Sequence, residues 1–336
     1  ALISLANDCL DHSPGWKITH KFLDLAHIQP VAKTISKAKL TEEWLEIIVR
    51  LIHLSKFHVG IMIEQRAVRY GDKTIFNMIH GDDLQTLSYT ELWLKIQITG
   101  KALSVLDRSE KPLVIGLLTY NQLNGVLVDL ACLSFGIRVI PIPLNSTTEN
   151  LSFILKQSEI THIFMGGKTA IRLWNQVHHN HDIPVIALND SSMIQGKVLD
   201  WELFIENRDR SQNFDLNQHL SNVSMDRTQT IMYTSGSTAN PKGITFNQNN
   251  IITKRFARAL ALPDFGSDDI FLCYLPLFHT FGRYFELIGS IFWGATYSFA
   301  ESPAFNSLLK DFPIVSPSIF ISIPKRWVQL YEMLEK

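Results

Sequence analysis

Strand-length apolar runs alternate with helical patterns from about residue 73 onward, and this alternation limits the possible fold more than any other feature. Buried strands are expected at residues 113–118, 139–143, 163–165 and 185–187, with helices at residues 121–135 and 148–157 between them. Strands and helices that alternate at this spacing form parallel sheets with helices on both faces. The sequence therefore predicts an α/β fold of layered, mostly parallel β-sheets flanked by helices.

Local signals also predict the start of this region. Residues 73–78 and 86–87 are expected to pair as a short hairpin around Gly81-Asp82-Asp83. Ser88 and Glu91 have the spacing of a capping box, so a helix should begin at Ser88 and run through Leu106.

Residues 1–58 are expected to form a helical N-terminal extension. Apolar residues recur at helical spacing after Thr41, which is the expected N-cap of a helix. This extension either packs on its own domain or docks a partner or a membrane surface, and its role is left open. Residues 59–222 are predicted to form a first α/β subdomain, and residues 223–336 an incomplete second one. The polar stretch 190–225 is expected to be loop.

Composition narrows the classes of function. The 336 residues are 46% hydrophobic with a net charge of −1, so no overall charge favours nucleic acid or anionic lipid. No apolar run approaches the roughly 18–20 residues that a membrane-spanning helix needs, although peripheral membrane contact stays possible. Cys9, Cys132 and Cys273 are scattered, which favours reduced thiols and a cytoplasmic location.

One loop carries most of the candidate chemistry. Residues 230–243 are Thr-Ile-Met-Tyr-Thr-Ser-Gly-Ser-Thr-Ala-Asn-Pro-Lys-Gly, an apolar strand that leads into a loop rich in hydroxyls. Such a loop can direct backbone N–H groups and hydroxyls at a polyphosphate, and Lys242 adds a positive charge. Its spacing differs from that of a Walker A loop. The alternative is a Ser/Gly-rich surface turn without a ligand.

Residues 233–243 resemble the phosphate-binding signature of the adenylate-forming superfamily of AMP-binding enzymes, which includes acyl-CoA synthetases, luciferases and peptide-synthetase adenylation domains. The resemblance implies an ATP phosphate grip and a hydroxyl ligand for Mg²⁺ from Thr234 or Thr238. The residues implied in the grip are Thr234, Ser235, Gly236, Ser237, Thr238 and Lys242. Ala239 replaces a usual glycine, which costs about 1 kcal/mol if that position needs a positive φ.

A second motif supports the same family. Leu275-Pro276-Leu277-Phe278-His279 resembles its Leu-Pro-x-x-His motif, which implies that His279 lies beside the acyl carboxylate as the catalytic residue. A histidine that merely starts a helix is the alternative. Phe281-Gly282-Arg283 keeps the Phe and Arg typical of the long-chain fatty acid–CoA ligase branch. Arg283 is expected either to orient phosphate or carboxylate oxygens or to pair with Glu286.

Two further segments resemble this branch. Residues 291–299 are similar to a strand of the family that contains Gly294. Residues 315–327 are similar to a segment typical of fatty-acyl members, which favours long-chain fatty acids over amino acids. Within the latter segment, alternating isoleucines at residues 319–323 predict a strand that forms either the wall of an acyl tunnel or plain buried core.

The resemblance covers roughly residues 73–336 and stops before the family's Tyr-Gly-x-Thr-Glu and Thr-Gly-Asp segments. We therefore expect the large N-terminal body of an adenylate-forming enzyme, truncated before its C-terminal part. The implied activity is that of an AMP-forming acyl-CoA ligase that uses ATP, Mg²⁺, CoA and a fatty acid, with this fragment alone not competent. A fatty acyl-AMP ligase that feeds a carrier protein, and a non-catalytic remnant that binds a nucleotide or a partner, remain alternatives.

Overall fold

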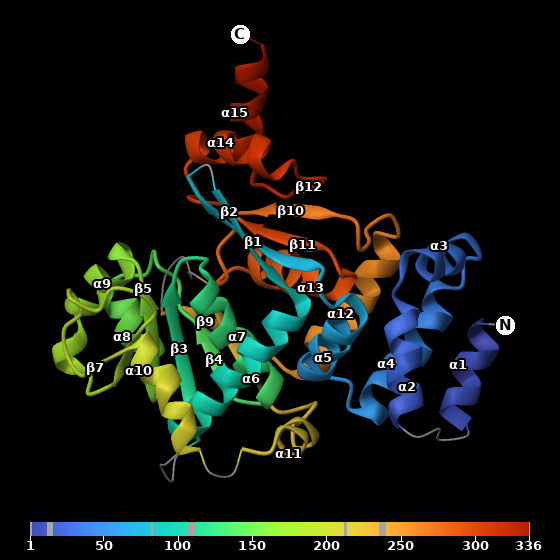
Figure 1. Ribbon diagram of the computed structural model, residues 1–336, viewed down its shortest axis with the longest axis horizontal. Helices are drawn as coiled ribbons and strands as arrows, with labels where there is room; N and C mark the ends of the chain where they lie inside the picture. The colour runs from blue at the N-terminus through green and yellow to red at the C-terminus, as the bar shows by residue number, and fades with distance from the viewer. Residues whose placement is uncertain are drawn as a thin grey trace.

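The structure is a computed structural model that describes residues 2–11, 16–81, 83–106, 112–211, 214–234 and 240–335. Two β-sheets lie in one body with helices packed around and between them (Figure 1). The N-terminal helices form one side of this body, and the last helices project from its top in the same view. The predicted α/β class is confirmed.

The larger sheet has seven strands in the order β7-β6-β5-β3-β4-β8-β9, parallel except for the antiparallel pair β8–β9. The strands are β3 (Val114–Thr119), β4 (Arg138–Pro141), β5 (His162–Gly166), β6 (Val185–Ala187), β7 (Val198–Asp200), β8 (Thr230–Thr234) and β9 (Lys242–Phe246). Helices α7 (Leu123–Phe135), α8 (Thr148–Gln157) and α9 (Lys168–Asn175) connect or flank them. The sequence predicted the first four of these strands because their residues are nearly all buried.

The smaller sheet has five strands in the order β12-β10-β11-β1-β2, of which only the β1–β2 pair is antiparallel. The strands are β1 (Thr74–His80), β2 (Asp83–Ser88), β10 (Ile270–Cys273), β11 (Thr296–Phe299) and β12 (Ile319–Phe320). The predicted hairpin is therefore confirmed. Both sheets take strands from each side of residue 222, and the division of the chain there stays a prediction.

Helix α6 (Tyr89–Leu106) begins with the predicted capping box. The Ser88 backbone N–H donates to a Glu91 carboxylate oxygen at 2.7 Å, and the Glu91 N–H donates to the Ser88 hydroxyl at 3.2 Å. The predicted N-cap at Thr41 is wrong. Thr41 is the first helical residue, and the cap position is Leu40, which has no side-chain acceptor.

The N-terminal helices pack on the body. They are α1 (Leu2–Asp11), α2 (Trp16–Ala26), α3 (Gln29–Lys37) and α4 (Thr41–Ser55), followed by α5 (Val59–Tyr70). Helix α4 contacts α1, α2 and α12 (Gln248–Ala261). The fully buried Arg66 of α5 donates to Asp24 at 2.5 Å and to the Phe292 carbonyl at 3.0 Å, which ties α2 and α13 (Ile288–Trp293) together.

Two stretches differ from expectation. Residues 190–225 were expected to be loop, but they contain β7, α10 (Trp201–Glu206), a 3-10 turn at Asn207–Arg210 and α11 (Leu216–Ser221). The sequence did not predict these elements because they are too short to show a clear periodicity. Only Thr296–Phe299 of the expected strand 291–299 is a strand. The residues before it form α13, which ends at Gly294 with φ +78°. An apolar run buried on all sides shows neither helical nor strand period.

The C-terminal elements are α14 (Phe305–Val315) and α15 (Pro324–Leu334), and a 3-10 turn occupies His178–Asn180. Strand β12 is only two residues long, so the predicted strand 319–323 is wrong beyond Phe320. Its residues are half-buried, and Ile323 is exposed. They do not form a buried wall.

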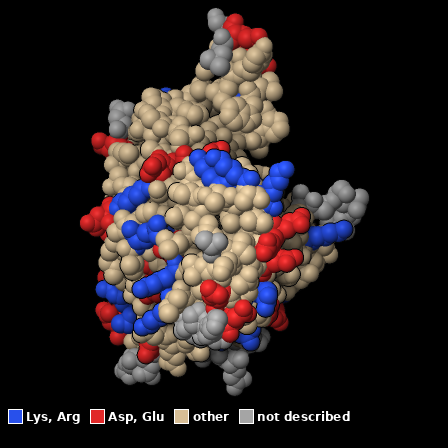
Figure 2. All heavy atoms as spheres, turned by 90° about the vertical axis from the view of Figure 1, so that its right-hand side faces the viewer, with Lys and Arg blue, Asp and Glu red and all other residues tan. Residues whose placement is uncertain are grey.

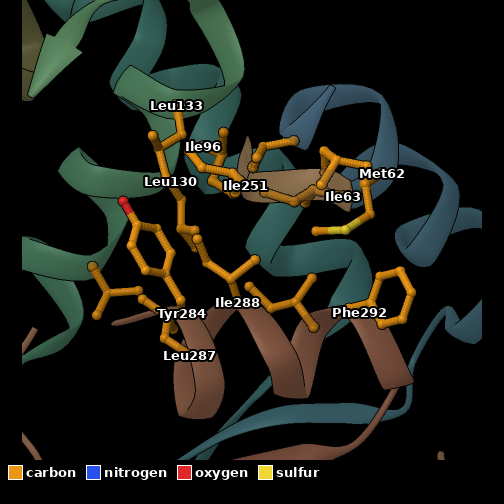
Figure 3. Packing of buried hydrophobic residues seen from close by; sticks show 14 of the residues in the cluster. Met62, Ile63, Ile96, Leu130, Leu133, Ile251, Tyr284, Leu287, Ile288 and Phe292 are labelled. Atoms are coloured by element: carbon orange, nitrogen blue, oxygen red, sulfur yellow. The ribbon is translucent and has the colours of Figure 1, made fainter. Parts of the chain in front are cut away.

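Helices supply most of the core between the two sheets. Figure 3 shows side chains from α5, α6, α7, α12 and the η3–α13 segment that point toward one another, where η3 (Phe281–Leu287) is a π-helix. The labelled residues are Met62, Ile63, Ile96, Leu130, Leu133, Ile251, Tyr284, Leu287, Ile288 and Phe292. This packing holds η3, which follows the candidate site, against the helices named above.

The outer surface shows no large field of one sign on the face drawn in Figure 2, where Lys and Arg alternate with Asp and Glu. None of the helices in the described ranges is long and apolar enough to cross a membrane.

Acid should destabilise this fold through His58. Its fully buried ring caps α5 by accepting from the Gly60 N–H at 3.1 Å and lies 3.0 Å from the Leu220 carbonyl. Burial lowers the pKa of His58 to about 4, against 6.5 for a free histidine. Since the unfolded chain then binds the extra proton, stability is lost as pH falls from 6.5 toward 4, by up to about 3 kcal/mol.

Urea unfolding of His58→Gln and wild type at pH 4.5, 5.5 and 7 measures how His58 contributes to the pH dependence of stability. The stability difference between the two should shrink as pH falls, whereas the exposed control His80→Gln should track wild type. A constant difference across these pH values contradicts the assignment.

Candidate active site

The predicted phosphate loop connects the antiparallel strands β8 and β9. Thr234 ends β8 directly opposite Lys242, the first residue of β9, and its hydroxyl donates to the Lys242 carbonyl at 3.4 Å. Opposed residues of such a pair project to the same face, so the lysine side chain emerges beside Thr234. Ser235, Gly236, Ser237, Thr238 and Ala239 lie between these two residues in the sequence and outside the described residues.

The glycine that closes the signature has a packing reason. A Cβ at Gly243 would lie 2.7 Å from a methyl of Ile231 and 3.3 Å from the Tyr233 ring. The Tyr233 hydroxyl in turn lies 2.9 Å from the Gln157 amide oxygen and 2.8 Å from the Ser158 hydroxyl. The apolar lead-in strand β8 is therefore held against the C-terminal end of α8.

A cavity of about 300 Å³ lies beside this hairpin. It opens where the carboxyl ends of β4 and β8 meet, the edge at which α/β sheets bind ligands. Thr234 and His279 both line it, so the structure brings these two predicted residues together. Its other walls are Pro143, Asn145, Ser146, Asn150, Ile154, Met232, Tyr233, Pro241, Ile244, Phe278 and Thr280.

His279 presents a hydrogen-bond donor. It is exposed and lies two residues before η3, and its Nδ1 accepts the Phe281 backbone N–H at 3.3 Å. A neutral ring that accepts through Nδ1 carries its proton on Nε2. The His279 backbone N–H donates to the Pro276 carbonyl at 2.9 Å, which fixes the start of the helix. The ring can therefore donate to an anionic oxygen in the cavity.

Both expectations for Arg283 are wrong. Its guanidinium is fully buried and pairs with the fully buried Asp129 of α7, through Nη2 at 2.5 Å and Nε at 2.9 Å. A third bond runs from Nη1 to the Thr230 hydroxyl at 2.7 Å. Residues three apart face each other in an α-helix, but η3 is a π-helix, so Glu286 lies elsewhere.

The carboxyl of Glu286 is also fully buried, and neither of its oxygens has a hydrogen-bond partner among the described residues. Burial disfavours the charged form and raises the pKa of Glu286 well above its ordinary value.

The sequence analysis missed two polar residues of the site. Asn145 lines the cavity, and Asn121 ties the segment before His279 to the end of β3. Both follow the carboxyl ends of predicted strands, which is the signal that could have identified them. Asp129 lies in the helix that the sequence predicted at residues 121–135, where no motif indicated its role.

The described lining fits a nucleotide phosphate better than a free metal ion. It offers hydroxyls, side-chain amides and the nearby Lys242, and it includes no Asp or Glu. Mg²⁺ in proteins usually takes one or two carboxylates together with substrate phosphates. The hydroxyl of Thr234 could therefore add one ligand to a Mg²⁺ that arrives on a triphosphate, and Thr238 stays a prediction.

Removing the Arg283 side chain should lower the free energy of unfolding. Arg283→Met leaves the buried charge of Asp129 unpaired, which costs about 3–5 kcal/mol of unfolding free energy. The double variant Arg283→Met/Asp129→Leu should recover much of this loss. Urea titrations of the single and double variants measure both, and a double variant as unstable as the single one would refute the explanation.

Replacing Glu286 should change the pH dependence of stability. Because its folded pKa is raised, the folded state binds more protons, and this carboxyl contributes stability that is lost as pH rises above 4.5. Glu286→Gln removes this loss, so its stability relative to wild type should rise with pH, by up to about 1.4 kcal/mol per pH unit. Unfolding curves at pH 5, 6.5 and 8 check the slope, and a stability difference that does not change with pH would contradict a raised pKa for Glu286.

Solved structures share the fold at low identity. The model superposes with a TM-score of 0.68 and 14% identity on a putative long-chain-fatty-acid CoA ligase from Rhodopseudomonas palustris CGA009, over 82% of this chain and 65% of that one. The N-terminal domain of FACL13 from Mycobacterium tuberculosis gives a TM-score of 0.65 and 17% identity, over 80% of this chain and 63% of that one.

Sequence relatives include two ligases. Long chain acyl-CoA synthetase 7, peroxisomal, of Arabidopsis thaliana is 24% identical over 65% of this chain and 31% of its own length. The long-chain-fatty-acid–CoA ligase ACSBG2 of Xenopus laevis is 22% identical over 82% of this chain and 38% of its own length. The chain thus spans about a third of the length of these relatives.

The AMP-binding enzyme family model matches residues 63–336, most of the chain and both sheets. The chain belongs to the AMP-binding enzyme family.

Proposed function

We propose that this chain is the nucleotide-gripping and carboxylate-facing part of an AMP-forming fatty acid–CoA ligase. The observation that carries the proposal is the single cavity that holds both Thr234, at the end of the phosphate hairpin, and His279, at the start of η3. These residues come from two motifs 45 residues apart (279 minus 234), each with a phosphate or carboxylate role in the resemblance.

The hairpin would hold the β- and γ-phosphates of ATP. Lys242 supplies positive charge next to Thr234, and backbone N–H groups and hydroxyls of the turn, at Ser235, Gly236, Ser237 and Thr238, complete the grip. Charge that develops on the departing pyrophosphate is then stabilised by groups already in place. Catalysis of this kind depends on positioning and electrostatics more than on covalent participation.

The fatty acid carboxylate would lie near His279. One carboxylate oxygen attacks the α-phosphorus of ATP, which forms acyl-AMP and releases pyrophosphate. The thiol of CoA then takes the acyl group, and AMP leaves. The Nε2–H of His279 would orient the carboxylate by donating to its second oxygen, since the Nδ1 is occupied by the Phe281 N–H.

A fatty substrate is supported by the names of the relatives and by the apolar residues of the cavity wall. Ile154, Met232, Ile244 and Phe278 lie along it, and no carboxylate is available there to pair with an amino group. We further propose that the chain alone forms little acyl-CoA, and that it operates in the cytoplasm.

Two alternatives give different results. A fatty acyl-AMP ligase that feeds a carrier protein would release pyrophosphate without consuming CoA. A remnant that binds only a partner would give no heat with ATP and Mg²⁺.

Calorimetry with MgATP tests the grip on this chain directly. Lys242→Ala should weaken binding about tenfold or more, because a hydrogen bond to a charged group contributes about 1.5–3 kcal/mol. Lys95→Ala, an exposed lysine on α6, is the matched control and should bind as wild type. Equal affinities for all three proteins would refute the role of Lys242.

A protein that carries this chain together with the rest of the ligase should show fatty-acid-dependent exchange of pyrophosphate into ATP. Lys242→Ala should lower that exchange strongly. Exchange supported by amino acids but not by fatty acids would overturn the proposed substrate class.

A further inference from the structure

We propose that Asn121 is a positioning residue that sets where Phe278, His279 and Thr280 stand relative to the phosphate hairpin. The inference rests on the proposed function for its substrate, but its structural part stands without a ligand. Asn121 itself need not touch the reacting atoms. It acts through the backbone of the segment that carries His279.

The cavity needs such a device because its walls come from different sheets. Asn145 follows β4 and Thr234 ends β8, both in the seven-stranded sheet. The segment 278–280 follows β10, which belongs to the five-stranded sheet. A shift of one sheet against the other would separate the hairpin from His279.

Asn121 joins the two sheets by hydrogen bonds. It follows β3 of the larger sheet, and its Nδ2 donates to the Leu275 carbonyl at 2.7 Å. Its Oδ1 accepts the Leu277 backbone N–H at 3.1 Å. Pro276, which lies between these two residues, has no N–H to donate. The Asn121 amide therefore satisfies the Leu275 carbonyl before the proline and the Leu277 N–H after it.

The placement of residues 275–277 is passed on to His279. The Pro276 carbonyl accepts the His279 N–H at 2.9 Å, and the His279 carbonyl accepts the Arg283 N–H at 3.0 Å. Helix η3 also lies directly on this segment, because a Cβ at Gly282 would be 2.3 Å from the Leu275 carbonyl oxygen. A movement of the clamped segment therefore moves the start of η3.

The two backbone hydrogen bonds of Asn121 require a side chain with both a donor and an acceptor, which an amide provides. A carboxylate at residue 121 would keep an acceptor for Leu277 but face the Leu275 carbonyl with a second oxygen, and an apolar side chain would leave both groups unpaired. Asn124 provides a matched control on α7. It is equally half-buried and donates to the Leu188 carbonyl at 2.9 Å, within the larger sheet and away from the clamped segment.

The experiment compares Asn121→Leu, Asn121→Asp and Asn124→Leu in the full chain. Hydrogen exchange of the His279 and Arg283 amides reports the backbone hydrogen bonds of this segment, and the ¹⁵N shifts of the His279 ring report its tautomer. Neither measurement needs a ligand. We expect faster exchange and a changed tautomer signal in both Asn121 variants, and wild-type behaviour at His279 in Asn124→Leu. If Asn121→Leu does not fold, Asn121→Ser replaces it in the same measurements.

Binding then tests the functional consequence. Affinity for a non-hydrolysable fatty acyl-sulfamoyl adenosine should fall about tenfold in Asn121→Leu, while affinity for AMP alone changes less than about twofold. Equal losses for both ligands, or a His279 signal unchanged from wild type, would overturn the positioning role. If the mimic fails to bind wild type, the proposed function fails, and exchange at His279 still decides the role of Asn121.

Discussion

The buried ion pair between Arg283 and Asp129 is the interaction on which the arrangement of the site depends. Both side chains are fully excluded from water, and the guanidinium uses three donors on Asp129 and the Thr230 hydroxyl. Burial alone would lower the pKa of Arg283, but the charge and hydrogen bonds of Asp129, together with Tyr284 and Cys132, raise that pKa above its ordinary value. Thr230 begins β8, the strand that ends at Thr234, so one arginine links η3, α7 and the strand of the phosphate hairpin.

Such a pair is a costly way to gain stability, because two desolvated charges recover little more than their burial costs. Apolar side chains of the same volume would hold η3 to α7 as firmly. What an ion pair adds is direction, since the planar guanidinium accepts only one placement of the carboxylate. Together with the amide of Asn121, it restricts how the two sheets meet, and we infer that this geometric role explains why charge is buried here.

The fold was most predictable where strands are buried along their length. Strand β3 is buried at all six residues and shows a clear apolar run, whereas the polar residues 190–225 conceal two short helices. Motifs that follow predicted strands mark Thr234 and His279 in the sequence, and both line the cavity, although their roles stay predictions. The partner of Arg283 was not, because Asp129 is 154 residues away and the nearby Glu286 matched a rule that holds for α-helices but not for a π-helix.

The distribution of hydrogen-bond donors explains why the site suits two anions at once. Thr234, Lys242 and the Nε2–H of His279 all offer protons, and the described lining contains no carboxylate to neutralise them. A triphosphate at the hairpin and a carboxylate at His279 would repel each other in water, yet both are favoured by the same donors. Under the proposed function, adenylate formation has to bring these two anions into contact. A cavity whose walls come from two sheets, and whose separation is set by buried braces, would lower the electrostatic cost of that contact by position and charge.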